Sequence, residues 1–306
     1  MVLDKKSLYA WSMGSYAKKI INDRGGQKAL VAHVFDNTIY LRMNNDELIL
    51  ISTYPWRSPF TINLAGIDYD GFSFKSIVSP LQKAVLLTDK IMMGELSIDI
   101  GEAKVYSGLG KPAGSRVDNN YLGHKLRLLL YVVGIIAGGL RDTSTPYLHS
   151  RICEYLNSDG LLSDNAMDSL IGLGEGFTPS GDDIYVGLSS AITYTYSYVD
   201  EKREVASSYL SRIKEGISAR LNQTTWASGM YLRYALSGLY DETIEKIMYD
   251  FYYGDIRDFY SSVVHLLRRG HESGVYLSLG VLLGLLSIYN SFKLHWANKL
   301  CSLLIG

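Results

Sequence analysis

Hydrophobic and polar positions follow one pattern in the first third of the chain and another in the rest. Between residues 28 and 106, short apolar runs alternate with turn formers such as Asn44, Asn45 and Asp46. This alternation predicts strands joined by tight turns, as in an antiparallel sheet or small barrel. The expected strands are 29–35, 47–51, 61–64, 84–87 and 95–100.

After Tyr121 the apolar positions recur with the period of helices. The pattern predicts helices near 122–139, 145–157, 163–171, 181–198, 201–219, 224–238, 241–250, 255–268 and 274–289. Gly134 with Gly138, and Gly280 with Gly284, repeat a small residue one turn apart. We expect these glycines to let neighbouring helices approach closely.

The two patterns together predict an α+β protein, with an N-terminal, mostly antiparallel β domain followed by a C-terminal α-helical bundle. We place the β domain, with a short N-terminal helix, at residues 1–110 and the helical domain at 122–306. Residues 111–121 form the expected linker, because the surrounding stretch is rich in Gly, Ser and Asn and lacks periodicity. A chain of 306 residues also favours two domains over one.

Composition narrows the range of partners and compartments. A formal net charge of -1 leaves no excess of Lys and Arg for a phosphate backbone, so nucleic acid is not the expected partner. The apolar stretches 128–140 and 275–289 fall short of the ~18 to 20 residues of a membrane span. No signal peptide is evident, and we expect a cytoplasmic protein without a membrane. Cys153 and Cys301 lack partners at short spacing, so we expect two buried free thiols.

The strongest candidate for chemistry is the glycine-rich loop at residues 172–183, which leads into a helical pattern. Ser180 can act as the N-cap, with Asp183 in the place of a capping-box acid. Free backbone N–H groups at such a helix start form a site for phosphate or carboxylate. The candidate anion-binding residues here are Gly174, Gly176, Thr178, Ser180 and Gly181. A well-capped helix connection without a ligand accounts for the same residues.

The adjacent carboxylates of Asp182 and Asp183 would repel an anion unless a positive group stands between them. They point about 100° apart around a helix. With Asp183 in the capping box, we expect Asp182 to face the ligand, where it could hold Mg²⁺ or orient a basic side chain.

Two further segments could complete the site. Arg269, His271 and Ser273 lie between two helical patterns and could bind a second anionic group or transfer a proton. Solvated arginines at a helix end are the simpler explanation. Thr225 and Ser228 open another helical run, where their hydroxyls could bind the anion or merely cap the helix.

Residues 172–183 closely resemble the Gly-rich Thr-Pro-Ser-Gly-Asp-Asp signature of the oxamate carbamoyltransferase AllH-like subunit family. The resemblance extends to residues 31–35, to Thr225 and Ser228, and to residues 270–274. It implies a subunit of an enzyme that exchanges oxamate and carbamoyl phosphate with oxalurate and phosphate in allantoin breakdown, and therefore partner subunits. Phe177, Glu272 and Tyr276 depart from the family pattern.

The sequence and the resemblance combine into one hypothesis. A carbamoyltransferase-like subunit binds carbamoyl phosphate, oxamate or a similar small anion at the glycine-rich loop, with Asp182, Asp183 and His271 as candidate catalytic residues. We expect the loop and residues 270–274 to share one cleft. No cofactor is certain, and Mg²⁺ at Asp182 is the candidate. The alternatives are a non-catalytic anion-binding or scaffold subunit and an Mg-dependent nucleotide phosphotransferase.

Overall fold

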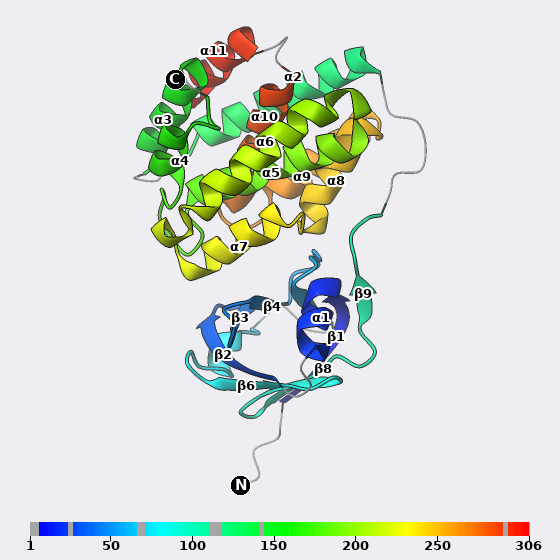
Figure 1. Cartoon of the computed structure of the whole chain (residues 1–306). Coiled ribbons are helices and arrows are strands. Elements are labelled where there is room, and N and C mark those ends of the chain that lie inside the picture. The colour runs from blue at the N-terminus through cyan, green and yellow to red at the C-terminus, as the bar shows by residue number, and fades with distance from the viewer. Residues whose placement is uncertain are drawn as a thin grey trace. The chain divides into compact units, whose positions relative to one another are not determined.

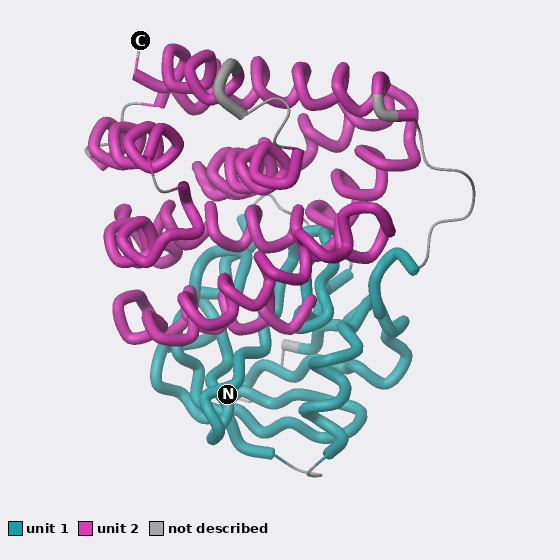
Figure 2. The backbone as a smooth tube through the Cα atoms, turned by 45° about the horizontal axis from the view of Figure 1, so that its top comes forward, with its two compact units in different colours: residues 1–110, 239–242 teal, residues 111–238, 243–306 magenta. Residues whose placement is uncertain are grey.

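The computed structural model describes residues 6–23, 27–65, 71–110, 118–140, 144–158, 160–289 and 293–305. The chain is α+β and divides into two compact units, shown in separate colours in Figure 2. Unit 1 comprises residues 1–110 and 239–242, and unit 2 comprises residues 111–238 and 243–306. The expected linker at 111–121 lies outside the described residues as far as residue 117.

Unit 1 holds the strands, which curve around a common interior in Figure 1. They are β1 (Lys6–Gly14), β2 (Gln27–Val34), β3 (Thr38–Met43), β4 (Leu48–Ser52), β5 (Thr61–Ala65), β6 (Lys83–Leu86), β7 (Lys90–Met93), β8 (Leu96–Asp99) and β9 (Lys104–Tyr106). The strands expected from the sequence correspond to β2, β4, β5, β6 and β8, whereas β1, β3, β7 and β9 were not predicted.

The strands form one mixed sheet rather than an antiparallel one. Its order is β5-β4-β3-β2-β6-β7-β8-β1-β9, and an additional pairing of β5 with β1 closes it into a barrel. The pairs β1–β8, β1–β9 and β4–β5 are parallel, and the others are antiparallel. The strands β8 and β9, which pair with β1 in parallel, lie far from it in the sequence, so the local pattern of short turns does not reveal this pairing.

Alternating side chains of the barrel strands fill its interior. In β3, for example, Ile39, Leu41 and Met43 are buried while the residues between them are more exposed. Register shifts at Trp11 in β1 and Ala32 in β2 mark β-bulges, which help a sheet to bend into a barrel. These side chains form a hydrophobic core inside the barrel.

Unit 2 holds the long helices. They are α2 (Asn119–Gly138), α3 (Thr145–Asn157), α4 (Asp164–Leu170), α5 (Ser180–Tyr198), α6 (Arg203–Ser218), α7 (Trp226–Leu236), α8 (Glu242–Tyr252, whose first residue belongs to unit 1), α9 (Ile256–Leu267), α10 (Ser273–Ile288) and α11 (Lys293–Leu304). Every helix that the periodicity predicts is present within a few residues. The helix α11 was not predicted. A short helix, α1 (Ser15–Asn22), lies in unit 1.

The helices α5 and α10 pack together at the centre of unit 2 (Figure 1). Nearly every side chain of α10 is buried, as expected for a helix that is apolar on all sides. A Cβ added at Gly280 would lie 2.1 Å from the Ile184 carbonyl oxygen, and one at Gly187 would lie 2.1 Å from that of Leu277. The two backbones therefore touch. This confirms the close approach that the spacing of Gly280 and Gly284 predicts.

The helix α2 is long and apolar enough to cross a membrane, contrary to the expectation from its shorter apolar stretch. About 44% of its apolar window is nevertheless buried in the protein. It packs against α9, α10 and α11, and a Cβ at Gly138 would lie 1.9 Å from the Leu303 carbonyl oxygen of α11. Length and composition alone are weak evidence for a membrane segment.

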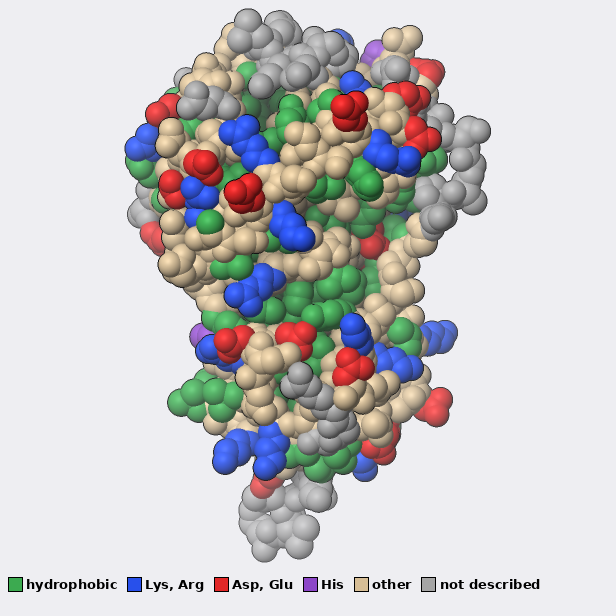
Figure 3. Space-filling model, in the orientation of Figure 1, with side chains coloured by type: hydrophobic (Ala, Val, Ile, Leu, Met, Phe, Trp, Pro, Cys, Tyr) green, Lys and Arg blue, Asp and Glu red, His purple; other side chains and the backbone are tan. Residues whose placement is uncertain are grey.

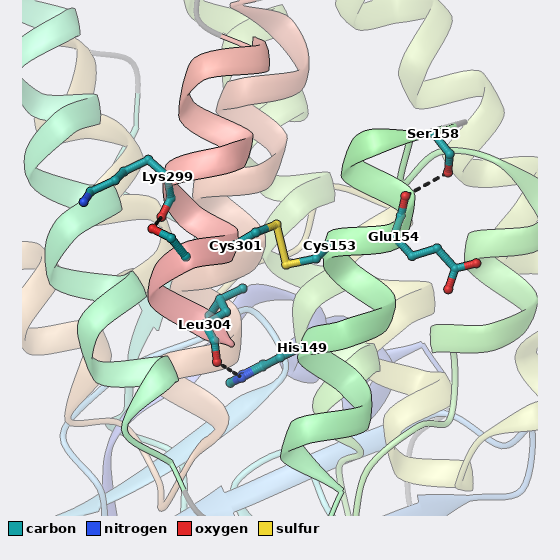
Figure 4. Close-up of a disulfide and its surroundings, with 8 residues drawn as sticks. His149, Cys153, Glu154, Ser158, Lys299, Cys301 and Leu304 are labelled. Carbon is teal, nitrogen blue, oxygen red and sulfur yellow. Dashed lines mark hydrogen bonds between the residues drawn. A yellow bond between two sulfur atoms is a disulfide. The ribbon is translucent and has the colours of Figure 1, made fainter. Parts of the chain in front are cut away.

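A disulfide joins Cys153 of α3 to Cys301 of α11, which corrects the prediction of two free thiols (Figure 4). The two residues are 148 positions apart, so their sequence spacing gives no sign of the pairing. Packing of α11 beside α3 brings their Cα atoms to 5.6 Å, which suits a disulfide. One turn away, His149 Nδ1 donates to the Leu304 carbonyl oxygen at 3.2 Å, and burial lowers the pKa of His149.

Acidic and basic side chains are interspersed on the visible surface of each unit (Figure 3). No extended area of one sign is seen on that face. The view agrees with the balanced composition of the chain.

Candidate functional site

The glycine-rich loop crosses the start of α5 with its glycines in conformations that other residues seldom adopt. Gly174 has φ 124° and Gly176 has φ 89°. A Cβ at Gly174 would lie 2.6 Å from the Ser180 backbone nitrogen, whereas one at Gly176 would meet open space. Gly174 is required both by its backbone angle and by its close approach to α5, and Gly176 by its angle alone.

The helix α5 begins one residue earlier than the sequence suggests. Its N-cap is Pro179 rather than Ser180, and no side chain caps it. A capping box is impossible here because proline has no N–H for an acid to accept. The predicted capping role of Asp183 is therefore wrong, and Asp182 occupies the third helical position instead.

Several N–H groups at this helix start are already occupied. The Gly181 N–H donates to the Leu173 carbonyl at 2.8 Å, and the N–H groups of Asp182 and Asp183 donate to Pro179. The expectation that Gly181 offers its N–H to an anion is therefore wrong. Gly181 also has a packing role, because a Cβ there would lie 1.8 Å from the Leu170 carbonyl oxygen.

Asp182 is a buried clamp that joins three segments, with only 1% of its surface exposed. One carboxylate oxygen accepts the Gly172 backbone N–H at 2.9 Å. The other accepts the Ser228 hydroxyl at 2.7 Å and the Thr224 hydroxyl at short range. Burial raises the pKa of Asp182, and these three hydrogen bonds oppose that rise. The hydroxyl of Thr224, which directly precedes the expected residue Thr225, is part of this clamp.

A hydrogen bond from Thr225 holds the middle of the loop. The Thr225 hydroxyl donates to the Phe177 carbonyl at 2.8 Å and accepts the Ser228 N–H, so Thr225 is the N-cap of α7. The capping interpretation of Thr225 is thus confirmed. Asp182 and Thr225 together fasten both ends of residues 172–177 to the body of unit 2.

These contacts leave several backbone N–H groups of the loop without a hydrogen-bond partner. Among the residues that the structure describes, the N–H groups of Gly174, Gly176, Thr178 and Ser180 make no hydrogen bond. Gly176 is exposed, and Thr178 is half-buried. Backbone N–H groups that lack a protein partner, in a glycine-rich turn that leads into a helix, can bind an anion.

The start of α10 meets this loop. The Thr178 and Ser273 hydroxyl oxygens are 3.3 Å apart, so the glycine-rich loop and the segment at residues 270–274 adjoin, as the sequence predicts. That a cleft lies between them stays a prediction.

Asp183 lies at the same junction, because its carboxyl group hydrogen-bonds to Ser273 and interacts with the Arg269 charge. Burial raises the pKa of Asp183 to about 8, and these two contacts oppose the rise. At neutral pH this carboxyl is therefore mostly protonated and uncharged.

His271 lies apart from this arrangement. Its side chain is exposed at the turn between α9 and α10, where Gly270 has φ 63°. No contact joins His271 to a described residue of the loop, in contrast to Arg269 and Ser273. The structure gives His271 no position that sets it beside Asp183, so its catalytic role stays a prediction.

The geometry does not suit Asp182 as a metal ligand, although the sequence makes it the Mg²⁺ candidate. Both oxygens accept hydrogen bonds from protein donors, and the side chain is almost fully enclosed. Within the described ranges, no group of three or more His, Cys, Asp or Glu side chains is arranged to hold a metal.

Comparison with known proteins finds a family model that matches part of the chain. The family model described as oxamate carbamoyltransferase subunit AllH matches residues 170–285, which run from the end of α4 through most of α10. The predicted resemblance to that family is thereby confirmed over this segment. No curated protein and no solved structure matches the chain.

Proposed function

We propose that the chain is a subunit of a carbamoyltransferase-like enzyme and that the loop at residues 174–180 binds its small anionic substrate. The match to a family described as a subunit of oxamate carbamoyltransferase supports the reaction class. The observation that carries the site is that the N–H groups of Gly174, Gly176, Thr178 and Ser180 make no hydrogen bond, in a loop whose Thr178 hydroxyl lies 3.3 Å from that of Ser273.

The local charges favour an anion in this position. Asp182 directs both oxygens at protein donors, and Asp183 is mostly uncharged at neutral pH. The guanidinium of Arg269 is close enough to influence Asp183. A carboxylate or phosphate oxygen at the loop therefore meets N–H dipoles and a cation rather than two negative charges.

This arrangement assigns the two aspartates different tasks. Asp182 is a positioning residue, because it acts on the loop through Gly172 and on α7 through Ser228. Asp183 can donate a proton or a hydrogen bond to a ligand at the Thr178–Ser273 junction, since its pKa of about 8 lies near neutral pH. Carbamoyl phosphate and oxamate each carry an anionic group and an amide for such contacts.

Ligand titration tests the site. Oxamate and inorganic phosphate are titrated calorimetrically into the wild type and into Thr178→Val and Arg269→Gln. We expect wild-type binding, and binding roughly tenfold or more weaker in each variant, which is about 1.4 kcal/mol. Ser197→Ala is the matched control, because Ser197 lies exposed in the last turn of the same helix, α5. Equal affinities in all four proteins, or no wild-type binding, would count against the site.

An activity assay then separates catalysis from binding. The chain is combined with its partner subunits, and formation of oxalurate from oxamate and carbamoyl phosphate is followed. If Asp183→Asn abolishes turnover but still binds oxamate, the result supports a catalytic role for Asp183. Binding at the loop with unchanged turnover in the Asp183, Thr178 and Arg269 variants would favour the alternative of a non-catalytic anion-binding subunit.

A further inference from the structure

The helix α2 has an apolar outer face in addition to the face that packs in unit 2. Tyr131, Ile135 and Ile136 are 40%, 59% and 40% exposed. Leu128 and Val132 are half-buried between them. Residues 128, 131, 132 and 135 recur at the three- and four-residue spacing that places side chains on one stripe of a helix.

A groove of about 610 Å³ runs along part of this stripe. It is lined by Tyr121, His124, Arg127, Leu128, Tyr131 and Val132 of α2 and by Ile256 at the start of α9. The Tyr121 hydroxyl accepts the Ile256 N–H at 2.9 Å, which joins α9 to α2 at the groove. A shallow, largely apolar groove of this kind suits side chains from the apolar face of another helix.

Cations without carboxylate partners border the groove. Arg127 lies over the Trp296 ring at 5.5 Å, and Lys299 lies over the Tyr131 ring at 5.6 Å. Neither forms an ion pair with a described residue. The acids nearest to Ile256 are Asp255 and Asp258, which form the capping box of α9, and Asp255 also pairs with Arg257. The free charge beside the exposed stripe is therefore positive.

We propose that this face of α2 docks an amphipathic helix of a partner subunit, with apolar residues in the groove and acidic residues opposite Arg127 and Lys299. The charge argues against a second copy of α2 as occupant, because residues 119–140 contain no Asp or Glu. A membrane surface is a poorer fit, since such helices carry many Lys and Arg on their polar face and α2 buries its other face in protein. The matched family is itself described as a subunit.

A designed peptide tests the chemistry of the groove directly. The probe is a labelled 21-residue helix with Leu at heptad positions a and d and Glu at e and g, and its binding is followed by fluorescence anisotropy. We expect binding to the wild type and at least roughly tenfold weaker binding to Ile135→Glu and to Arg127→Glu, from lost apolar contact and reversed charge. Exchange of Glu for Lys in the peptide should restore binding to Arg127→Glu.

The variants are chosen to preserve folding and the anion site. Ile135 and Tyr260 are 59% and 50% exposed, so Tyr260→Glu on α9 is a matched control that should bind the acidic peptide like the wild type. Circular dichroism and oxamate titration should be unchanged in all the variants. If the wild type does not bind oxamate, the proposed function is refuted, but the peptide test of the groove remains valid.

Three results would overturn the proposal. One is equal binding of the acidic and the Lys-substituted peptide to the wild type. Another is a wild-type dimer in sedimentation equilibrium that Ile135→Glu dissociates, which would assign the face to a second copy of the chain. The third is flotation with vesicles of seven parts phosphatidylcholine to three parts phosphatidylglycerol that Ile135→Glu abolishes, without peptide binding.

Discussion

The raised pKa of Asp183 predicts that the stability of the protein falls as pH rises towards 8. Its carboxyl group has a pKa of about 8 in the folded protein and 3.8 in an unfolded chain. Between these values the folded state keeps a proton that the unfolded state has released, so the free energy of unfolding decreases with pH. Replacing Asp183 with Asn removes the titration and should remove this decrease.

The size of the effect follows from the shift. About four pKa units at 1.36 kcal/mol each give roughly 5 to 6 kcal/mol between pH 4 and 8. This is an upper bound, because water and side-chain movement around Ser273 and Arg269 can stabilise the carboxylate. A measured difference of about 2 to 4 kcal/mol is the practical expectation.

Urea unfolding from pH 5 to 8 provides the measurement, with the wild type, Asp183→Asn and an exposed control, Asp200→Asn, followed in parallel. Asp200 pairs with Arg203 at the surface and is 81% exposed, so its loss should shift the wild-type curve little and leave its slope. Curves of equal slope for the wild type and Asp183→Asn would refute the reasoning, because they would show that the folded protein does not raise the pKa of Asp183.

Three further changes test the packing around the site. Asp182→Asn replaces an oxygen acceptor with an amide donor that faces hydroxyl groups. It should therefore lower the free energy of unfolding by roughly 2 to 4 kcal/mol. A urea midpoint equal to that of the wild type would contradict the role of Asp182 as a clamp. Gly181→Ala should lower the free energy of unfolding by about 1 to 3 kcal/mol, because its Cβ would lie 1.8 Å from the Leu170 carbonyl oxygen. This loss should exceed the gain from the higher helix propensity of alanine. A rise in melting temperature would contradict the prediction and show that the backbone shifts without cost. Reduction of the Cys153–Cys301 disulfide removes a link between residues 148 positions apart and should lower the free energy of unfolding by up to about 5 kcal/mol. A phosphine reductant should therefore lower the melting temperature of the wild type and leave that of the double serine variant unchanged.

The elements that the sequence predicts well are those with a strong local period. The helices from α2 to α10 follow from apolar spacing, because each buries one stripe or, like α10, all sides. The barrel is different. Its closure depends on β1, which pairs with β5, β8 and β9, strands 50 to 100 residues away along the chain. Such register is decided by contacts between distant segments, and the local pattern of β1 carries little sign of it.

The site shows how one residue of uncertainty in a helix boundary reverses a functional assignment. Capping rules place Asp183 at the helix start and leave Asp182 for the ligand, provided that Ser180 is the N-cap. The helix begins after Pro179 instead, and Asp182 turns inward to hydroxyls on the segment that opens α7, more than 40 residues later. The residues next to Asp182 in the sequence give no sign of these partners.

The same boundary resolves the repulsion that two adjacent carboxylates would exert on an anion. The Asp182 carboxylate accepts three hydrogen bonds from protein donors. Asp183 lies a further 100° around the helix, and desolvation of its half-buried carboxyl group raises its pKa to about 8. An anion at the loop therefore meets one screened carboxylate and one neutral acid. Above pH 8 Asp183 ionises, so oxamate affinity at the loop should fall there in the wild type and stay level in Asp183→Asn, while level affinity in both proteins would separate the ligand from Asp183.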